Sequence, residues 1–329
     1  MTAACEADGV VPTASRSSRT TSPLALWTAL AIVYVVWGST YLGIRIVVDV
    51  ADQPPLFPTG VRFVIAGTVL AAAVTLRQGW RELQVPLRQM ASGALHGFLF
   101  LFCGVGMVTV AEQTVPSGLA ALLVAAMPLW VVLMRAGIGG DRPSLLTWIG
   151  TTVGLGGIAV LARPDTQGDV ALWGVLLILF ATVCWAFGVF ITPRLPLPTD
   201  NFVGAVYTMA GGGTALLVGG AVTGEFADFS ISAVPAEGWW AFTYLTLIGS
   251  VVAFSAFVWL LGHAPPSLVT TYAYINPVVA VFLGWLILSE PVTPPVVVGG
   301  SLAVVGVALV VRGEHPRAAS EPEEVVQHG

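Results

Sequence analysis

Ten stretches of about 20 consecutive, mostly apolar residues recur along this chain of 329 residues, and they limit its fold more than any other feature. A helix needs roughly 20 apolar residues to cross the hydrocarbon core of a bilayer. Strands of a membrane β-barrel would be about half as long and would alternate in polarity, which these stretches do not. The sequence therefore predicts an all-α integral membrane protein with ten transmembrane helices, at residues 25–48, 56–76, 90–110, 116–136, 144–162, 170–191, 202–223, 238–261, 266–288 and 293–311.

The composition agrees with this class. Only 9% of the residues are charged and 56% are hydrophobic, whereas a soluble protein carries about 25% charged residues. There is no basic patch with interleaved aromatic residues, which argues against a nucleic-acid partner. The three cysteines have no spacing typical of a disulfide framework or a zinc site, so we expect no metal and no cofactor. Residues 1–24 and 313–329 are polar and are predicted to be disordered tails, and residues 1–24 lack the apolar core of a signal peptide.

The arginines indicate the orientation in the membrane. If the N-terminus is inside, Arg163 is the one arginine in an outer connection, and ten arginines lie inside: Arg16, Arg19, Arg77, Arg81, Arg88, Arg135, Arg142, Arg194, Arg312 and Arg317. Basic residues concentrate on the cytoplasmic side of membrane proteins. We therefore expect a multi-pass protein of the inner (cytoplasmic) membrane with both termini in the cytoplasm.

The two halves of the chain resemble each other at an offset of 149 residues. Matching positions include Pro116 with Pro265, Pro128 with Pro277, Gly150 with Gly299, Gly157 with Gly306 and Arg163 with Arg312. This predicts two five-helix repeats, at residues 25–162 and 163–312. Because five is odd, the second repeat must be inverted relative to the first. Many secondary transporters have inverted repeats, with the substrate site near the midplane between them.

Five segments carry a resemblance to a known family: WGSTYLGIR (37–45), VRFVIAG (61–67), AAMPLWVVL (125–133), YAYINPVVAVFLGWLILSEPVTP (272–294) and GGSLAVVGVALVVR (299–312). The chain resembles the EamA-type branch of the drug/metabolite transporter superfamily. The resemblance implies ten transmembrane helices in two inverted five-helix repeats around a central cavity. It also implies transport of small metabolites or drugs, usually outward and often coupled to protons or to a counter-substrate.

The first two spans carry polar residues that could line such a cavity. Trp37, Ser39 and Tyr41 form a cluster in the first span, which could equally serve close helix packing beside small residues. Arg45 lies near the outer end of the first span and Arg62 about two turns into the second. Either arginine could bind an anionic or zwitterionic group of the substrate. Alternatively, Arg45 extends to the outer interface and pairs with Asp49, four residues later.

Further candidates come from the second half. Trp185, Tyr272, Tyr274 and Asn276 are predicted to face the substrate, although Asn276 could instead bridge two helices. Pro128 and Pro277 are predicted hinges, because a proline frees a backbone carbonyl and can kink a helix. A purely structural kink is the alternative interpretation for both. Glu290, in the SEP connection, is interpreted as a cap or loop contact.

Two residues are candidates for proton coupling. His96 lies in the inner part of the third span, and Glu112 lies at its outer end. A histidine titrates near neutral pH, which would suit proton coupling, but the favoured interpretation of His96 is an interfacial or hydrogen-bonded histidine. Glu112 is expected to be solvated unless it has a gating or proton role.

The function expected from the sequence is secondary transport of small organic metabolites or drugs, with export as the expected direction. Alternating access would arise from rocking of the two five-helix halves. The alternatives are a channel and an intramembrane enzyme acting on a lipid-like substrate, although the motifs of paired acids, metal-binding histidines or phosphate loops are missing. The expected partners are the small-molecule substrate, the lipid bilayer, and a proton or counter-substrate. The sequence does not distinguish a monomer from a homodimer.

Overall fold

The computed structural model describes residues 22–140, 142–162, 172–264 and 266–314, which form helices and connecting loops. Arg163, Pro265 and most of the two predicted tails lie outside these residues. The inner ends of the tails are helical rather than disordered, because α1 begins at Pro23 and α15 ends at Glu314. The first half contains α1 (Pro23–Arg45), η1 (Ile46–Val50), α2 (Leu56–Gln78), η2 (Trp80–Leu83), α3 (Leu87–Gly97), η3 (Phe98–Gly106), α4 (Met107–Ala111), α5 (Ser117–Val124), α6 (Met127–Gly137) and α7 (Leu145–Leu161). The second half contains α8 (Leu172–Ile191), η5 (Thr192–Arg194), α9 (Asn201–Val222), α10 (Glu225–Asp228), η6 (Ile231–Ala233), α11 (Ala236–Thr243), η7 (Tyr244–Val252), α12 (Ala253–His263), α13 (Pro266–Val269), α14 (Tyr272–Leu288) and α15 (Pro294–Glu314).

Eight of these helical segments are long and apolar enough to cross a membrane. They are Pro23–Val50, Leu56–Gln78, Leu87–Ala111, Ser117–Gly137, Leu172–Arg194, Asn201–Val222, Ala236–Leu261 and Pro294–Gly313. The two other expected spans correspond to α7 and α14, which are apolar but have only 17 residues each. The all-helical membrane fold is therefore confirmed, and the described residues contain eight spans of full length, so the expected number of ten is not confirmed.

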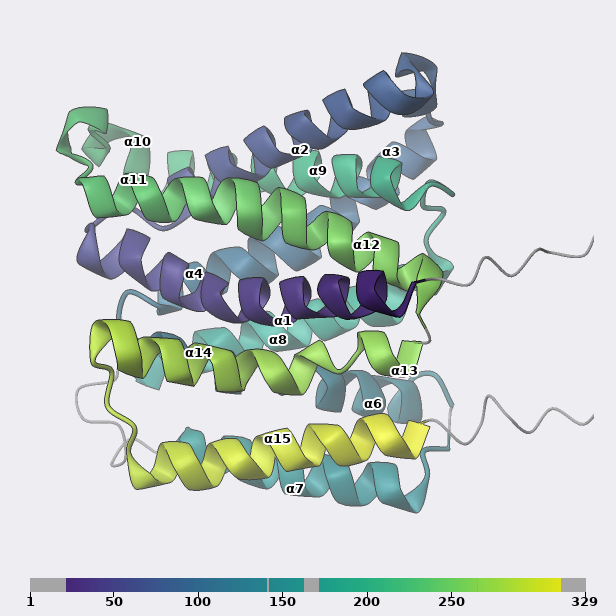
Figure 1. The fold of residues 1–329 in the computed structure, drawn as a ribbon, viewed down its shortest axis with the longest axis vertical. Coiled ribbons are helices and arrows are strands. Elements are labelled where there is room, and N and C mark those ends of the chain that lie inside the picture. The colour runs from purple at the N-terminus through teal and green to yellow at the C-terminus, as the bar shows by residue number, and fades with distance from the viewer. Residues whose placement is uncertain (1–21, 141, 163–171, 265, 315–329) are drawn as a thin grey trace, which may run out of the picture.

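The helices lie side by side, and the described chain starts and ends on the same face of the bundle (Figure 1). We call this face, where α1 begins and α15 ends, the terminal face, and the opposite face the loop face. Corresponding helices of the two halves run in opposite directions. For example, α2 runs from the loop face to the terminal face, whereas α9 runs back (Figure 1).

The helices pack in two groups that mix the halves of the sequence. The α9 group contains α2, α3–η3–α4, α9 and α11–η7–α12, and the α15 group contains α5, α6, α7, α14 and α15. The most extensive contacts join α7 with α15 and α2 with α9. Helices α1 and α8 lie between the groups and pack against both (Figure 1). Rocking of the two sequence halves would break the α7–α15 and α2–α9 contacts, so the packing does not fit that expectation.

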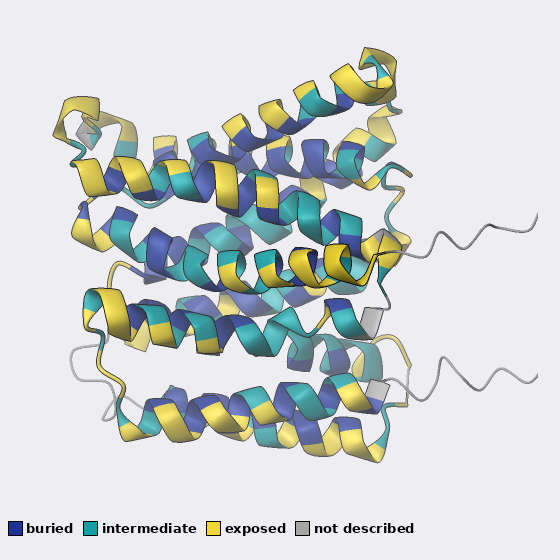
Figure 2. Cartoon of the chain, viewed as in Figure 1, coloured by how far each residue is buried: buried dark blue, intermediate teal, exposed yellow. Residues whose placement is uncertain are grey.

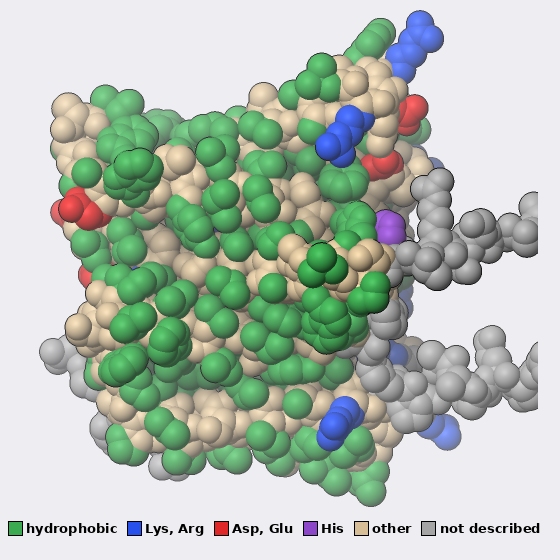
Figure 3. All heavy atoms as spheres, in the orientation of Figure 1, with side chains coloured by type: hydrophobic (Ala, Val, Ile, Leu, Met, Phe, Trp, Pro, Cys, Tyr) green, Lys and Arg blue, Asp and Glu red, His purple; other side chains and the backbone are tan. Residues whose placement is uncertain are grey.

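The largest apolar core lies mainly in the α15 group but also includes Val108 and Ala111 of α4, and a second core lies in the α9 group. In the α15 group, the core includes Leu123, Leu129, Leu161, Ala303 and Val307. The core of the α9 group includes Phe63, Leu70, Met209 and Leu216. Buried stripes face inward and exposed stripes outward along the helices (Figure 2). Apolar side chains cover the outer flank, whereas charged side chains gather toward the two ends of the bundle, as a lipid-facing surface requires (Figure 3).

Glycines allow α7 and α15 to approach closely. A Cβ atom on Gly157 would lie 2.5 Å from the backbone nitrogen of Ala303 and 2.6 Å from the backbone oxygen of Gly299. The neighbouring Gly156 is exposed and would meet no atom within 4 Å. Close approach through small residues is a common way for membrane helices to associate.

We therefore predict that Gly157→Ala destabilises the protein by about 1–3 kcal/mol, because the methyl group forces two backbones apart. The matched variant Gly156→Ala should leave stability unchanged or raise it slightly, since alanine favours helices. Thermal unfolding of both variants in detergent tests this. Equal midpoints would contradict the close contact.

The two predicted hinge prolines occupy different positions in their helices. Pro128 stands in the first turn of α6, after α5 has ended at Val124 and the chain has made a short turn. Pro277 lies inside α14 and is buried, and the break in that region falls earlier, at the turn before Tyr272. The fourth span is therefore broken beside its proline, whereas α14 continues through its own.

Candidate functional site

An aromatic contact joins the two helix groups across α1. The Trp37 ring centroid lies 4.9 Å from that of Phe257 in α12 and 5.3 Å from that of Tyr272 in α14. Phe257 and Tyr272 also touch each other, with centroids 5.7 Å apart and planes at 90°. Phe257 belongs to the α9 group and Tyr272 to the α15 group. The three rings therefore meet at the boundary between the groups.

Arg62, in α2, is buried, with a relative exposure of 6%. It is the seventh residue of α2, so it sits about 9 Å along the helix from the loop face. Its Nε donates to Ser250 Oγ (2.8 Å), and its guanidinium lies 4.8 Å from the centroid of Phe63. Its Nη1 is buried and has no hydrogen-bond partner in the described part of the chain.

A π-helical segment, η7, receives both Trp37 and Arg62. Trp37 Nε1 donates to the Gly249 carbonyl (3.3 Å), and Ser250 Oγ donates to the carbonyl of Leu245, five residues earlier (3.1 Å). A Cβ on Gly249 would lie only 3.5 Å from Arg62 Nη2. Short π-helical segments often occur at functional sites. We name Trp37, Arg62, Gly249, Ser250, Phe257 and Tyr272 the central cluster.

The sequence predicted Trp37, Arg62 and Tyr272 but missed Gly249, Ser250 and Phe257. The pair Gly249–Ser250 is a small, partly polar step in an otherwise apolar span, and this was the available signal. No such signal marked Phe257 in the sequence, because phenylalanine is common in lipid-facing and core positions alike.

Trp185 occupies a similar position against the other long π-helical segment, η3. A Cβ on Gly104 would lie 3.3 Å from Trp185 Cε3, and the Trp185 and Phe100 ring centroids are 5.9 Å apart. Each of these tryptophans therefore lies in the first span of one half and packs on a π-helix of the other half. Trp185 is separate from the contacts of the central cluster.

The remaining predicted substrate residues have other contacts. Ser39 Oγ donates to the Val36 carbonyl (2.9 Å) and pairs with the Tyr244 hydroxyl (2.5 Å). Tyr41 and Tyr274 pack against the core of the α15 group. Asn276 is buried, and its amide nitrogen, turned toward acceptors, reaches the carbonyls of Tyr34 and Tyr272, each at 3.2 Å. This geometry fits the alternative in which Asn276 bridges α14 and α1.

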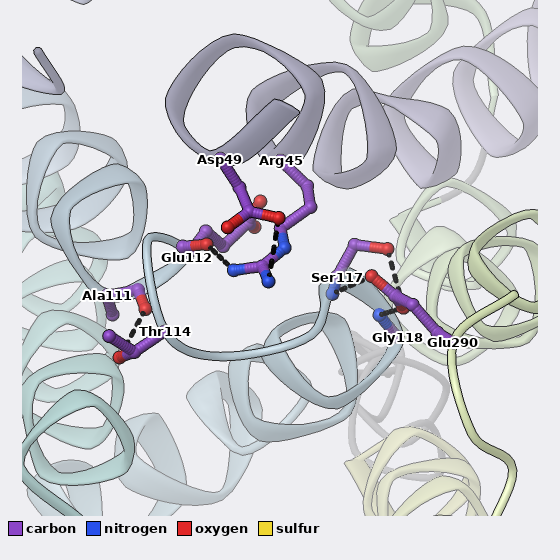
Figure 4. A network of polar contacts seen from close by, with 8 residues as sticks. All are labelled: Arg45, Asp49, Ala111, Glu112, Thr114, Ser117, Gly118 and Glu290. Carbon is purple, nitrogen blue, oxygen red and sulfur yellow. Dashed lines mark hydrogen bonds and ion pairs between the residues drawn. The ribbon is translucent and has the colours of Figure 1, made fainter. Parts of the chain in front are cut away.

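A second polar cluster lies at the loop face (Figure 4). Arg45 Nη2 pairs with Asp49 Oδ2 at 2.9 Å, as expected for residues four apart on a helix, and Arg45 Nη1 donates to the Glu112 backbone carbonyl. Glu112 directly follows α4 and is fully buried, and neither carboxyl oxygen has a hydrogen-bond partner within the described ranges. The expectation that Glu112 is solvated is therefore wrong, because the chain folds this loop under α1.

Glu290 confirms the prediction of a cap. Ser289, in the left-handed conformation, ends α14 and turns the chain toward α5. The Glu290 carboxylate then accepts from the backbone nitrogens of Ser117 (2.8 Å) and Gly118 (3.1 Å) and from Ser117 Oγ (3.0 Å) (Figure 4). A carboxylate at a helix N-terminus satisfies free N–H groups and the helix dipole.

The α9 group has a matching contact at the same face. The Glu225 carboxylate accepts from the backbone nitrogens of Phe57 (2.7 Å) and Leu56 (3.0 Å) at the start of α2. Each carboxylate therefore links the two halves of the sequence within one helix group. Both contacts strengthen the groups as packing units.

The environment of Glu112 favours its protonated form. Burial raises the pKa of the Glu112 carboxyl well above its usual value, the nearby Glu290 raises it further, and Arg45 opposes the rise. The unfolded chain releases this proton near the ordinary pKa of 4.5, whereas the folded protein keeps it. The stability should therefore fall as pH rises above that value, by up to about 1.4 kcal/mol per pH unit.

Glu112→Gln should remove this fall, because glutamine carries no proton to lose. We expect the variant to unfold at a higher temperature than the wild type at neutral pH and to depend less on pH. Thermal unfolding in detergent from pH 5 to pH 8 tests this, with the exposed Glu237→Gln as control. A variant with the wild-type pH profile would contradict it.

His96 is distant from Glu112. It lies 16 residues (112 − 96) before Glu112, inside the span that ends at Ala111, and this separation corresponds to about 24 Å of helix. Its Nδ1 lies 3.3 Å from Thr208 Oγ1, and its ring stacks on Phe100 with centroids 4.0 Å apart. The structure therefore does not join the two proton-coupling candidates in one site. In the described ranges there is no group of three or more side chains suited to a metal ion.

The fold and the central cluster define a helical membrane protein in which two helix groups meet at an aromatic contact, and a buried arginine packs on the same π-helical segment as Trp37. The EamA-like transporter family matches the chain twice, at residues 25–163 and 172–312. The chain belongs to this family and is a membrane transporter. The expected resemblance is therefore confirmed.

Known relatives agree with this assignment. The "Uncharacterized inner membrane transporter YedA" of Escherichia coli (strain K12) is 41% identical over 264 residues, which cover 79% of this chain and 82% of that protein. The "Uncharacterized transporter YoaV" of Bacillus subtilis (strain 168) is 24% identical over 282 residues, covering 84% of this chain and 92% of that protein. A solved structure titled "Crystal structure of protein" shares the fold, with a TM-score of 0.59 and 21% identity, covering 90% of this chain and 98% of the other.

Proposed function

We propose that the protein is a secondary transporter that exports a small organic solute by alternating access. The observation that carries this proposal is the central cluster, where polar groups of α1, α2 and η7 lie in the apolar interior at the boundary of two helix groups. Transporters with inverted repeats bind their substrates in such places. Tyr41 and Tyr274 extend the proposed path into the α15 group, and Trp185, in α8, holds the equivalent position beside η3.

The repeats at residues 25–162 and 163–312 are proposed to form an inverted pair. The opposite directions of α2 and α9, and of α7 and α15, support this (Figure 1). In this proposal α7 and α14 complete ten crossings despite their shorter length, since 17 residues is within the lower range for a span. The terminal face is the cytoplasmic one in an inner membrane, consistent with the arginines near it and with the printed name of YedA.

The moving bodies in this proposal are the α9 group and the α15 group. Direct contacts between the groups occur where Phe257 of α12 meets Tyr272 of α14. They also occur where Val108 and Ala111 of α4 join the apolar core of the α15 group. Helices α1 and α8 contact both groups and would carry the hinges. Separating the groups would open the central cluster to one face without breaking the α7–α15 or α2–α9 contacts.

Glu112 is the proposed coupling residue. A buried carboxyl without a hydrogen-bond partner is stable there only while it holds its proton. Opening of the loop face would hydrate Glu112 and release the proton to that side. Arg45, Asp49 and Glu290 surround it and would respond to its charge (Figure 4). His96 remains the second candidate, and a counter-substrate the alternative to a proton.

The proposed function can be tested without knowing the substrate in advance. Proteoliposomes are loaded with a cellular metabolite extract and diluted, and the solutes that leave are identified by mass spectrometry against protein-free vesicles. We expect a restricted set of organic solutes to leave, with saturation and with acceleration by the same solute on the opposite side. Unselective, non-saturating leakage would indicate a channel, and no protein-dependent release would contradict transport of soluble metabolites.

A further inference from the structure

The guanidinium of Arg62 lacks an acidic partner in the described protein. Its ring and hydroxyl contacts are those to Phe63 and Ser250, and no carboxylate lies within 4.0 Å of it among the described residues. Arg45, in contrast, has Asp49. The two arginines near the start of the chain's membrane region therefore differ: Arg45 is neutralised by its own helix, and Arg62 is not.

An isolated cation at this depth is costly. Charged side chains within membrane helices are unfavourable unless they are paired or reach water, and arginine stays protonated in proteins. Burial also removes the water that would otherwise bind its five N–H groups. A buried charge is normally paired or hydrogen-bonded, and the Nη1 group of Arg62 is neither.

The described residues contact one face and one edge of the guanidinium. Phe63 covers a face of the guanidinium, and Ser250 holds its Nε edge. Gly249 carries no side chain, and the Nη2 atom lies beside it. The Nη2 atom therefore lies next to η7 at Gly249, whose carbonyl also accepts the hydrogen bond from Trp37. A planar guanidinium presents paired N–H groups in the geometry that suits the two oxygens of a carboxylate or phosphate.

We propose that Arg62 binds an oxyanion group of the transported solute, so that the substrates are organic carboxylates, zwitterions with a carboxylate, or organic phosphates. This inference rests on the proposed transport function. The oxyanion accepts hydrogen bonds from the terminal nitrogens of Arg62 and completes the charge balance of the central cluster. Because Arg62 is buried in this structure, the solute reaches it when the α9 and α15 groups separate.

Matched pairs of probes test the substrate class without a transport assay. Thermal unfolding of the full-length protein is measured with benzoate and benzamide, succinate and succinamide, L-leucine and L-leucinamide, and glycerol 3-phosphate and glycerol. A ligand that binds the folded state raises its stability. We expect stabilisation by at least one anionic member and none by its uncharged or amidated partner. The first three pairs report a carboxylate site and the fourth a phosphate site.

Variants assign the effect to Arg62. Arg62→Gln should abolish the stabilisation by the anionic probe, and Arg62→Lys should weaken its binding roughly ten- to hundredfold because it keeps the charge but loses the paired donors. The control Arg77→Gln removes an exposed arginine in the same helix and should bind like the wild type. If Arg62→Gln does not fold, the wild-type protein still decides the question through its preference within each pair.

The exchange experiment separates this inference from the transport proposal. If the proteoliposomes release only neutral or cationic solutes, transport stands and the anionic class is overturned. If anionic probes stabilise Arg62→Gln as they stabilise the wild type, the role of Arg62 is overturned. If no anionic member of any pair stabilises the wild type and no anionic solute is released, the inference is wrong.

Discussion

Linking Phe257 to Tyr272 stops transport, according to the proposed movement of the two helix groups. Their rings touch across α1 at a centroid distance of 5.7 Å, and they belong to different groups. Cysteines at these two positions, in a background without Cys5, Cys103 and Cys184, can be joined by a short cleavable thiol reagent. Because the groups must separate there once per cycle, we expect exchange to fall to the level of protein-free vesicles and to return on cleavage.

A second pair serves as the control for this experiment. Phe57 and Phe229 also have touching rings, 4.8 Å between centroids, but both lie at the loop face within the α9 group. Their cross-link should leave exchange unchanged. Exchange by each cysteine variant is compared before and after cross-linking, so that a loss of exchange caused by the substitutions themselves does not affect the comparison. Full exchange by the linked Phe257–Tyr272 pair would refute separation of the groups at this point.

Replacing Trp37 has the second large expected effect. Trp37→Ala removes the hydrogen bond to Gly249 and both ring contacts at the group boundary. We expect exchange to fall by roughly tenfold or more, since aromatic contacts and a hydrogen bond of this kind are together worth more than about 1.4 kcal/mol. Trp37→Phe keeps an aromatic ring but loses the hydrogen-bond donor. Its exchange rate should lie between those of the wild type and Trp37→Ala.

Trp27 provides a matched control on the same helix. It is 59% exposed on the surface, so Trp27→Ala should leave exchange near the wild-type level. Membrane abundance and thermal stability are measured for all three variants. Exchange by Trp37→Ala at the rate of Trp27→Ala, with equal abundance, would remove Trp37 from the site.

The sequence was sufficient for the parts of the fold that depend on local pattern. Apolar length predicted the helices, although α7 and α14 are shorter than the other spans. The sequence could not predict which helices pack together, because apolar faces in lipid carry no strong preference for a partner. The mixing of the two halves in the α9 and α15 groups therefore appeared only in the structure.

Local pattern also predicted part of the candidate site. Trp37, Arg62 and Tyr272 stood out as polar or amphipathic residues within spans. Ser250 became important only through its bond to Arg62, which depends on the rotation of η7 against α2. Glu112 was misjudged, since its position at the end of a span suggests water, whereas tertiary packing of the following loop buries it completely.

Separation of the α9 and α15 groups can be observed as a change of distance between them in a lipid bilayer. Spin labels at Trp240 in α11 and Val292 after α14 report on the distance between the groups, and labels at Trp240 and Val222 report within the α9 group; all three side chains are exposed. With a solute identified by the exchange experiment, we expect a new population for the first pair and an unchanged distance for the second. If the labels at Trp240 and Val292 show a single distance that does not change when a transported solute is added, alternating access by these two groups is contradicted.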